Sequence, residues 1–248
     1  MKIILSPAKK MNVDRDSLEY IGLPAYLEQT KEILSWLQSL SYGELKKLWA
    51  CNDKIAEQNY ERLQGMSLEE RLTPAVLSYE GIAYQYMAPA VFETGHLNYI
   101  QEHLRILSGF YGVLKPMDGV TPYRLEMQAK ATVGRCRDLY EFWGDRLYWE
   151  VRDAGGVIIN LASKEYSRCI EKYLTDQDTY ITCIFGETVN GKLVQKGTYA
   201  KMARGEMVRY MAENRIENPQ EMKNFDRLGY VYREDLSTDT SYIFERKT

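Results

Sequence analysis

Two kinds of hydrophobic pattern alternate along the chain. Short, continuous apolar runs at residues 2–5, 156–161 and 180–185 are typical of strands that are buried on both faces. Between these runs, apolar residues recur at the three- and four-residue spacing of helices. This spacing predicts helices at residues 25–40, 41–50, 54–63, 74–86, 97–107 and 138–153, in a segment that begins near 163, and at 199–215. The alternation of helices with buried strands favours a mixed α/β (α+β) fold, with helices around a central mixed sheet.

Turn signals complete this outline. Residues 108–127 are rich in Gly and Pro and are expected to form turns and short extended pieces. Asn190 and Gly191 give the strongest hairpin signal in the chain. Further strands are expected at residues 193–196, 228–233 and 242–246. Because no linker or internal repeat interrupts the pattern, residues 1–248 are expected to form one compact domain.

Residues 40–63 are expected to form a helical hairpin. Ser41 and Glu44 have the spacing of a capping box at the start of its first helix. Residues 51–53 interrupt the helical pattern only briefly before it resumes. Two short helices joined by so short a break pack against each other in an antiparallel pair.

Two of the buried runs end in similar polar sequences. The first run is followed by Ser6 and Lys9, and the other by Asn160 and Ser163. If the two strands are parallel neighbours, these four side chains converge at the sheet edge where α/β proteins bind ligands and where helix N-termini favour anions. The alternative is that Ser163 only caps a helix and that the lysines are solvated.

The predicted helix at 199–215 carries cations on its apolar side. Lys201, Arg204 and Arg215 fall within the arc occupied by its apolar residues. A buried cation without a partner is strongly destabilising, so this helix must direct these groups onto an anion-binding cleft or onto buried carboxylates. Both arrangements fit the pattern.

A third candidate group lies in the Gly- and Pro-rich segment. Alternation along residues 123–127 directs Arg124 and Glu126 to one side, and Asp118 precedes them in the same segment. Neighbouring acidic and basic side chains suit proton transfer, so these three are candidate catalytic residues. An Arg–Glu pair with a purely structural role fits equally well.

Composition limits the classes of site. The net charge is −3 and the sequence pI is about 5.6, so a site for phosphate or nucleic acid must be a local patch. Four scattered cysteines indicate reduced thiols, and the two histidines are seven residues apart, so neither a metal site nor a cofactor is expected. The chain has no signal-peptide core and no apolar run of membrane-spanning length, so a cytoplasmic protein with no membrane partner is expected.

Five segments carry a signal beyond periodicity. They are ILSPAK at 4–9, HLRILSGFYGVLKPMDGVTPYRLEM at 103–127, DLYEFWGD at 138–145, VIINLASKEY at 157–166 and YAKMARG at 199–205. Their sequences and their order resemble the YaaA family of peroxide stress proteins. The resemblance implies a single mixed α/β domain and a cytoplasmic role in limiting iron-dependent oxidative damage from hydrogen peroxide. It also implies DNA binding through a helix-hairpin-helix element and a positively charged cleft.

The first hypothesis follows this resemblance. The helix-hairpin-helix element corresponds to residues 40–63, although residues 50–53 lack the glycine that is usual in DNA-binding hairpins. The protein would bind double-stranded or structured DNA through its backbone and shape, without base specificity. The phosphate contacts would come from cations of the hairpin and of the last long helix: Lys46, Lys47, Lys54, Lys201, Arg204 and Arg215.

The second hypothesis is an enzyme or binding protein for a small anionic, nucleotide-like ligand. Asp118 or Glu126 would act as its proton acceptor. Its pocket would be lined by Ser6, Lys9, Arg124, Asn160, Ser163, Lys201 and Arg204. A long open groove favours DNA, whereas an enclosed pocket with convergent polar groups favours a small ligand. DNA binding is the leading prediction, and catalytic activity is left open.

Overall fold

The computed structural model describes residues 1–247. Within them, eight strands form one mixed sheet in the order β11-β12-β9-β8-β1-β5-β6, with β10 paired to β9. The strands are β1 (Lys2–Leu5), β5 (Leu104–Ser108), β6 (Gly112–Leu114), β8 (Val157–Asn160), β9 (Thr179–Val189), β10 (Lys192–Val194), β11 (Tyr230–Tyr232) and β12 (Ser241–Arg246). The central strands β5, β1, β8, β9 and β12 are parallel, and β6, β10 and β11 join antiparallel. The predicted mixed α/β fold with a central mixed sheet is confirmed.

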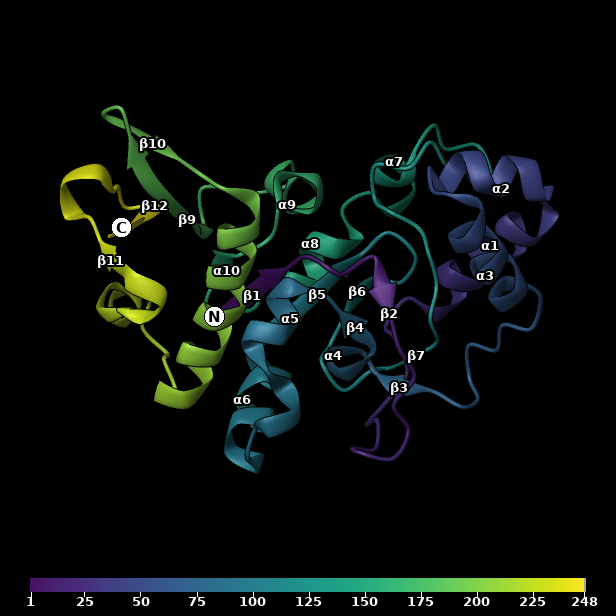
Figure 1. Cartoon of the computed structure of the whole chain (residues 1–248), viewed down its shortest axis with the longest axis horizontal. Coiled ribbons are helices and arrows are strands. Elements are labelled where there is room, and N and C mark those ends of the chain that lie inside the picture. The colour runs from purple at the N-terminus through teal and green to yellow at the C-terminus, as the bar shows by residue number, and fades with distance from the viewer. Residues whose placement is uncertain (248) are drawn as a thin grey trace.

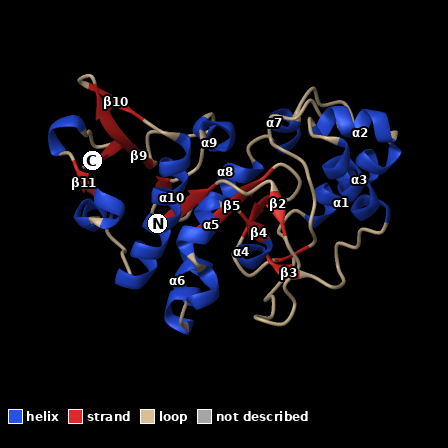
Figure 2. Cartoon of the chain, viewed as in Figure 1, coloured by secondary structure: helices blue, strands red, loops and turns tan. Residues whose placement is uncertain are grey.

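Helices surround this sheet (Figures 1 and 2). They are α1 (Leu27–Ser39), α2 (Tyr42–Trp49), α3 (Asp53–Gln64), α4 (Ala75–Ser78), α5 (Ile82–Met87), α6 (Thr94–His103), α7 (Leu139–Trp143), α8 (Arg146–Val151), α9 (Lys164–Glu171) and α10 (Gly197–Asn214). Figure 1 places α1, α2 and α3 at one end of the long axis and the C-terminal strands at the other. Among residues 1–247, no helix is long and apolar enough to cross a membrane.

Two small ladders hold the loops that leave the sheet. Strand β2 (Lys10–Met11) pairs with β4 (Tyr79–Glu80), and β3 (Thr73–Pro74) pairs with β7 (Gly119–Val120). The first ladder fixes the chain just after β1, because β2 begins only five residues beyond the end of that strand. The loop between β1 and β2 is therefore anchored at both ends.

The helix predicted at 97–107 is wrong in its second half. Helix α6 ends at His103, and the next five residues form β5, which pairs with β1 through Ile3 and Leu104. The apolar run of β5 is fully buried, and such a run fits a buried strand as well as a buried helix. Tertiary pairing with β1 decides the outcome.

Two other predicted helices are broken. The helix expected at 74–86 is divided into α4 and α5, because Tyr79 and Glu80 pair with β2 instead. The helix expected at 138–153 is divided into α7 and α8 at Gly144, whose φ of 56° does not continue a helix.

Both helices expected at 40–63 are present. The predicted capping box is confirmed, since Ser41 Oγ accepts from the N–H of Glu44 and the Glu44 carboxylate accepts from the N–H of Ser41 at 2.8 Å. Helix α2 ends at Ala50 in the left-handed region, with φ of 44°, where glycine is favoured. DNA binding by this hairpin stays a prediction.

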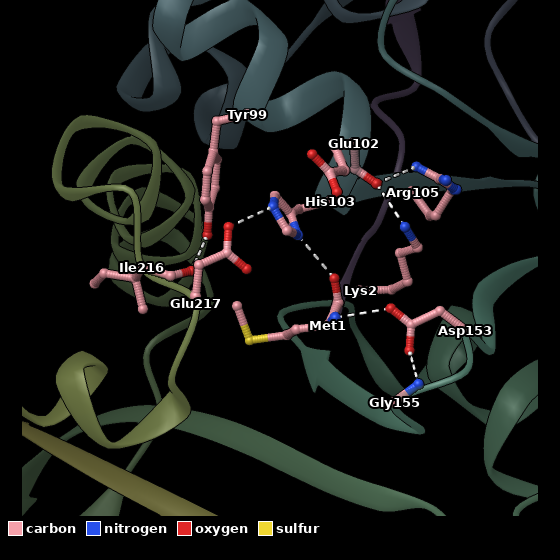
Figure 3. A network of polar contacts seen from close by, with 10 residues as sticks. All are labelled: Met1, Lys2, Tyr99, Glu102, His103, Arg105, Asp153, Gly155, Ile216 and Glu217. Carbon is pink, nitrogen blue, oxygen red and sulfur yellow. Dashed lines mark hydrogen bonds and ion pairs between the residues drawn. The ribbon is translucent and has the colours of Figure 1, made fainter.

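A network of polar contacts lies at the amino-terminal ends of the parallel strands (Figure 3). The amino group of Met1 lies 2.7 Å from Asp153 Oδ2. His103 at the end of α6 contacts the carbonyl oxygen of Met1 through Nδ1 at 2.9 Å and the Glu217 carboxylate through Nε2 at 3.1 Å. Tyr99 donates to the carbonyl oxygen of Ile216 at 2.6 Å. These contacts join α6, the start of β1 and the segment after α10.

Candidate anion-binding pocket

A cavity of about 390 Å³ lies where β1 and β8 end. These strands are parallel neighbours in register, with Ile4 opposite Asn160, so their carboxyl ends meet at one edge of the sheet. The loop before β2, the start of α5, residues 123–126, the start of α9 and one face of α10 complete its wall. The lining residues include Ser6, Lys9, Lys10, Glu80, Tyr84, Tyr123, Arg124, Glu126, Ser163, Glu165, Tyr166, Lys201 and Arg204.

Two serines from the paired strand ends contact each other in this pocket. Ser6 Oγ accepts from the N–H of Ser163 at 2.8 Å, and the two hydroxyl oxygens are 3.2 Å apart. Ser163 is the N-cap residue of α9, but its side chain makes no capping hydrogen bond. The expected convergence of Ser6 and Ser163 is therefore present. The alternative holds only in part: Ser163 does not serve as a helix cap, but the lysine after β1 is solvated, since the Lys9 side chain is 65% exposed.

Two guanidinium groups from different segments reach the same pocket. Among the described residues, Nε of Arg124 and Nε of Arg204 are both buried and have no hydrogen-bond partner. Burial lowers the pKa of Arg204, and no carboxylate acts on it. The Arg124 side chain is 12% exposed, and its nearest carboxylate oxygen, on Glu126, is 3.7 Å away. Arg124 therefore forms a long ion pair with Glu126, as the Arg–Glu alternative expected, but the same carboxylate oxygen lies closer to Lys9. Arg204 forms no ion pair among residues 1–247, so its charge is the less compensated of the two.

Close packing of α10 on α5 brings Arg204 to the pocket wall (Figure 1). A Cβ atom at Gly205 would lie 1.9 Å from the carbonyl oxygen of Ala83, so only glycine fits at this contact. Gly81 plays a similar part, since its Cβ would lie 2.7 Å from that of Ala8 in the loop after β1. These glycines let three segments approach closely around the cavity.

The carboxylates of the pocket are fewer than its cations. Among the described lining residues, five cationic side chains face three carboxylates. Glu126 lies 2.9 Å from Lys9 Nζ, and Glu80 lies 2.6 Å from Lys10 Nζ. Burial raises the pKa of Glu165, which accepts from the N–H of Gln128 at 3.2 Å. The pocket is thus a local cationic site in an acidic protein.

The expected positions of Lys201 and Arg215 need correction. Both side chains are exposed, although the helical pattern places them on the apolar side of α10. Lys201 still lines the pocket. Arg215 is the residue that ends α10, with φ of 49°, and its guanidinium lies beside Gly95. It is directed away from the helix face because the chain leaves the helix there.

Asn160 and Asp118 lie outside the pocket lining. Asn160 is buried below it, where its Oδ1 accepts from the N–H of Ala162 at 2.9 Å and shapes the turn after β8. Asp118 accepts from the N–H of Lys115 at 2.8 Å, and burial raises its pKa to about 6. Of the three candidate catalytic residues, Arg124 and Glu126 line the pocket, whereas Asp118 does not.

The hairpin lysines lie away from this pocket, toward the end of the molecule that holds α2 and α3 (Figure 1). Lys46 is paired with Asp53, whereas Lys47 and Lys54 are exposed. The structure therefore divides the predicted phosphate contacts between two separate surfaces.

Sequence reasoning missed the tyrosines, Lys10 and two carboxylates of the pocket, Glu80 and Glu165. Tyr84 donates to the carbonyl oxygen of Ser6 at 3.0 Å, and Tyr123, Tyr166 and Glu165 also line the cavity. The alternation along 123–127 directs Tyr123 away from Arg124, but both residues reach the pocket because this segment is not a strand. Glu165 and Tyr166 come shortly after Ser163 in the sequence, and this proximity is the signal that could have indicated them.

Comparison with known proteins identifies the family. The sequence model described as "Peroxide stress protein YaaA" matches residues 1–236. The chain belongs to the YaaA family. It is 67% identical over 247 residues to a UPF0246 protein of Agathobacter rectalis, covering 100% of this chain and 99% of that protein. A UPF0246 protein of Lachnoclostridium phytofermentans is 57% identical over 244 residues, covering 98% and 96% of the two chains.

This membership supports a role in peroxide stress. Across residues 1–247, no three His, Cys, Asp or Glu side chains lie close enough together to hold a metal ion.

Proposed function

We propose that the chain acts in peroxide stress by binding a small, anionic, nucleotide-like ligand in this pocket. The observation that carries the proposal is that Arg124 and Arg204, which come from different segments, both line the pocket and each hold a buried Nε without a hydrogen-bond partner among the described residues. A buried N–H donor without a partner is destabilising, whereas a phosphate group offers charge-assisted, often bidentate, hydrogen bonds to arginine.

The size of the cavity favours a small ligand over a polymer backbone. Its volume of about 390 Å³ lies in the range of small-molecule sites, roughly 300–1,000 Å³. The walls come from five separate segments, as expected for a pocket with convergent polar groups. This favours the second sequence-based hypothesis over the first.

The distribution of charge assigns parts of the ligand to parts of the pocket. The cations Arg124, Arg204 and Lys201 would take the anionic group, together with the hydroxyl group of Ser163. Glu126 and Glu165 would accept hydrogen bonds from hydroxyl or amino groups of the ligand, because ionised carboxylates only accept. Glu126 remains the candidate proton acceptor if a reaction occurs, since Asp118 lies outside the lining.

Calorimetric titration with adenosine 5′-monophosphate and with inorganic phosphate tests the proposal. Arg204→Met should weaken binding of both probes about tenfold or more, since a hydrogen bond to a charged group contributes roughly 1.5–3 kcal/mol. Arg209→Met is the matched control, because Arg209 lies on the same helix but is paired with Glu213 at 2.7 Å outside the pocket. Wild-type protein that binds neither probe would reject the proposal.

DNA binding, with shielding of DNA from iron-dependent oxidative damage, is the second candidate. It is favoured by the exposed Lys47 and Lys54 on the α2–α3 hairpin, and by the left-handed Ala50 at the turn between the helices. These lysines would contact phosphates of double-stranded or structured DNA without reading bases.

A salt titration with labelled duplex DNA tests this second candidate. Each phosphate contact contributes about 0.9 to the slope of log K against log salt, so Lys54→Glu should reduce the slope by about 1. Glu57→Gln is a control on the same helix that leaves the lysine in place. An unchanged slope in Lys54→Glu would exclude the hairpin as the DNA-binding surface.

A further inference from the structure

Two buried hydroxyl groups are hydrogen-bonded to the hydroxyl group of a tyrosine that lines the pocket. Ser108 Oγ lies 2.6 Å from the hydroxyl oxygen of Tyr123, and Tyr79 OH lies 2.8 Å from the same oxygen. All three side chains are buried, and Tyr123 is the member that lines the pocket. The direction of each hydrogen bond decides where the hydrogen of Tyr123 points.

The backbone fixes the direction of the Ser108 bond. Ser108 Oγ accepts from the N–H of Phe110 at 3.2 Å and from the N–H of Tyr111 at 2.9 Å. A hydroxyl oxygen has two acceptor positions, so both are occupied. Ser108 must therefore donate its hydrogen to Tyr123.

Burial fixes the direction of the Tyr79 bond. Tyr79 is 3% exposed, and among the described residues the only hydrogen-bond partner of its hydroxyl group is Tyr123. Buried donors are almost always hydrogen-bonded, and this rule holds for both phenols. Only Tyr123 lines the pocket, where an occupant can accept its hydrogen, whereas Tyr79 lies outside the lining, so we infer that Tyr79 donates to Tyr123. The oxygen of Tyr123 then accepts two hydrogen bonds, and its own hydrogen has no acceptor among the described residues.

We propose that Tyr123 donates this hydrogen to an anionic oxygen of the ligand bound in the pocket, beside the guanidinium of Arg124. This assignment rests on the proposed function, because it requires an anion there. Burial raises the pKa of Tyr123 to about 12, so the phenol keeps its hydrogen at neutral pH. Two incoming hydrogen bonds also polarise the phenol and strengthen it as a donor.

Tyr123→Phe removes the donor and keeps the ring, which stacks on Phe110 at 4.9 Å between centroids. Titrated with inorganic phosphate, this variant should bind at least about tenfold more weakly than the wild type. Tyr79→Phe is the matched control, because it loses a hydroxyl group bonded to the same oxygen but lies outside the pocket lining. It should bind phosphate within about threefold of the wild type.

The outcomes separate the two proposals. Phosphate binding that is equal in Tyr123→Phe and the wild type overturns the role of Tyr123 and leaves the anion pocket standing. A wild-type protein that binds neither inorganic phosphate nor adenosine 5′-monophosphate removes both proposals. If Tyr123→Phe does not fold, the ¹³Cζ resonance of Tyr123 in the wild type decides: saturating phosphate must shift it, and a resonance that stays in place refutes the assignment.

Discussion

At the scale of single residues, the molecule places charged groups in two different kinds of buried surroundings. Arg204 is half-buried, with its Nε fully buried, beside a cavity that can admit a counter-ion. Asp118 is buried in a packed position outside the pocket lining, where the N–H of Lys115 and the nearby Arg105 partly compensate it. The buried position therefore indicates a binding function for Arg204 but not for Asp118.

Asp118 makes stability depend on pH. Its pKa of about 6 in the folded protein is above the value of about 4 expected for an unfolded chain. The folded state therefore binds more protons between these values, and the contribution of Asp118 to stability is largest below pH 4 and decreases as pH rises to about 6. In urea unfolding, Asp118→Asn should gain on the order of 2 kcal/mol relative to the wild type at pH 7 and little at pH 4.

The matched control for this experiment is Asp16→Asn, because Asp16 is exposed. It should leave the pH dependence of unfolding unchanged. A stability difference between Asp118→Asn and the wild type that is the same at pH 4 and pH 7 would contradict the assigned titration.

At the scale of elements, the contact between α10 and α5 sets the shape of the pocket. The carbonyl oxygen of Ala83 occupies the space that a side chain at Gly205 would need. Gly205→Ala should therefore destabilise the protein by about 3 kcal/mol or more, because the clash involves backbone on both sides. Gly43→Ala in α2 should instead stabilise it by about 0.5–1 kcal/mol, since nothing lies within 4 Å of its added Cβ.

Denaturant unfolding of both variants checks this prediction, and calorimetry with phosphate extends it. Gly205→Ala should also weaken phosphate binding, because Arg204 is displaced with the helix. Equal stability of Gly205→Ala and the wild type would show that α10 and α5 are not in close contact.

The elements that sequence patterns predicted best are those whose pattern has one interpretation. The capping box of Ser41 and Glu44 and the apolar strand at 157–160 were read correctly. Strand β5 was missed because an apolar run after a helix continues its pattern until pairing with β1 ends it. The pairing of β5 with β1 joins segments about 100 residues apart, so the local sequence does not indicate it.

At the scale of the whole molecule, the site arises from parts that are distant in sequence. Ser6 and Ser163 could be predicted together because parallel strand ends meet at one edge of a sheet. The role of Tyr123 could not, because its partners Tyr79 and Ser108 are 44 and 15 residues away and no periodicity relates them. The net charge of −3 describes the whole chain, so it does not indicate the local excess of cations in the pocket.

The most direct measurement is a crystal structure of the wild-type protein grown with adenosine 5′-monophosphate. We expect a phosphate group within hydrogen-bonding distance of Arg204 and of the Ser163 hydroxyl group, in the cavity between the ends of β1 and β8. A pocket that stays empty at a saturating concentration of the nucleotide, or nucleotide bound only on the α2–α3 hairpin, would contradict it.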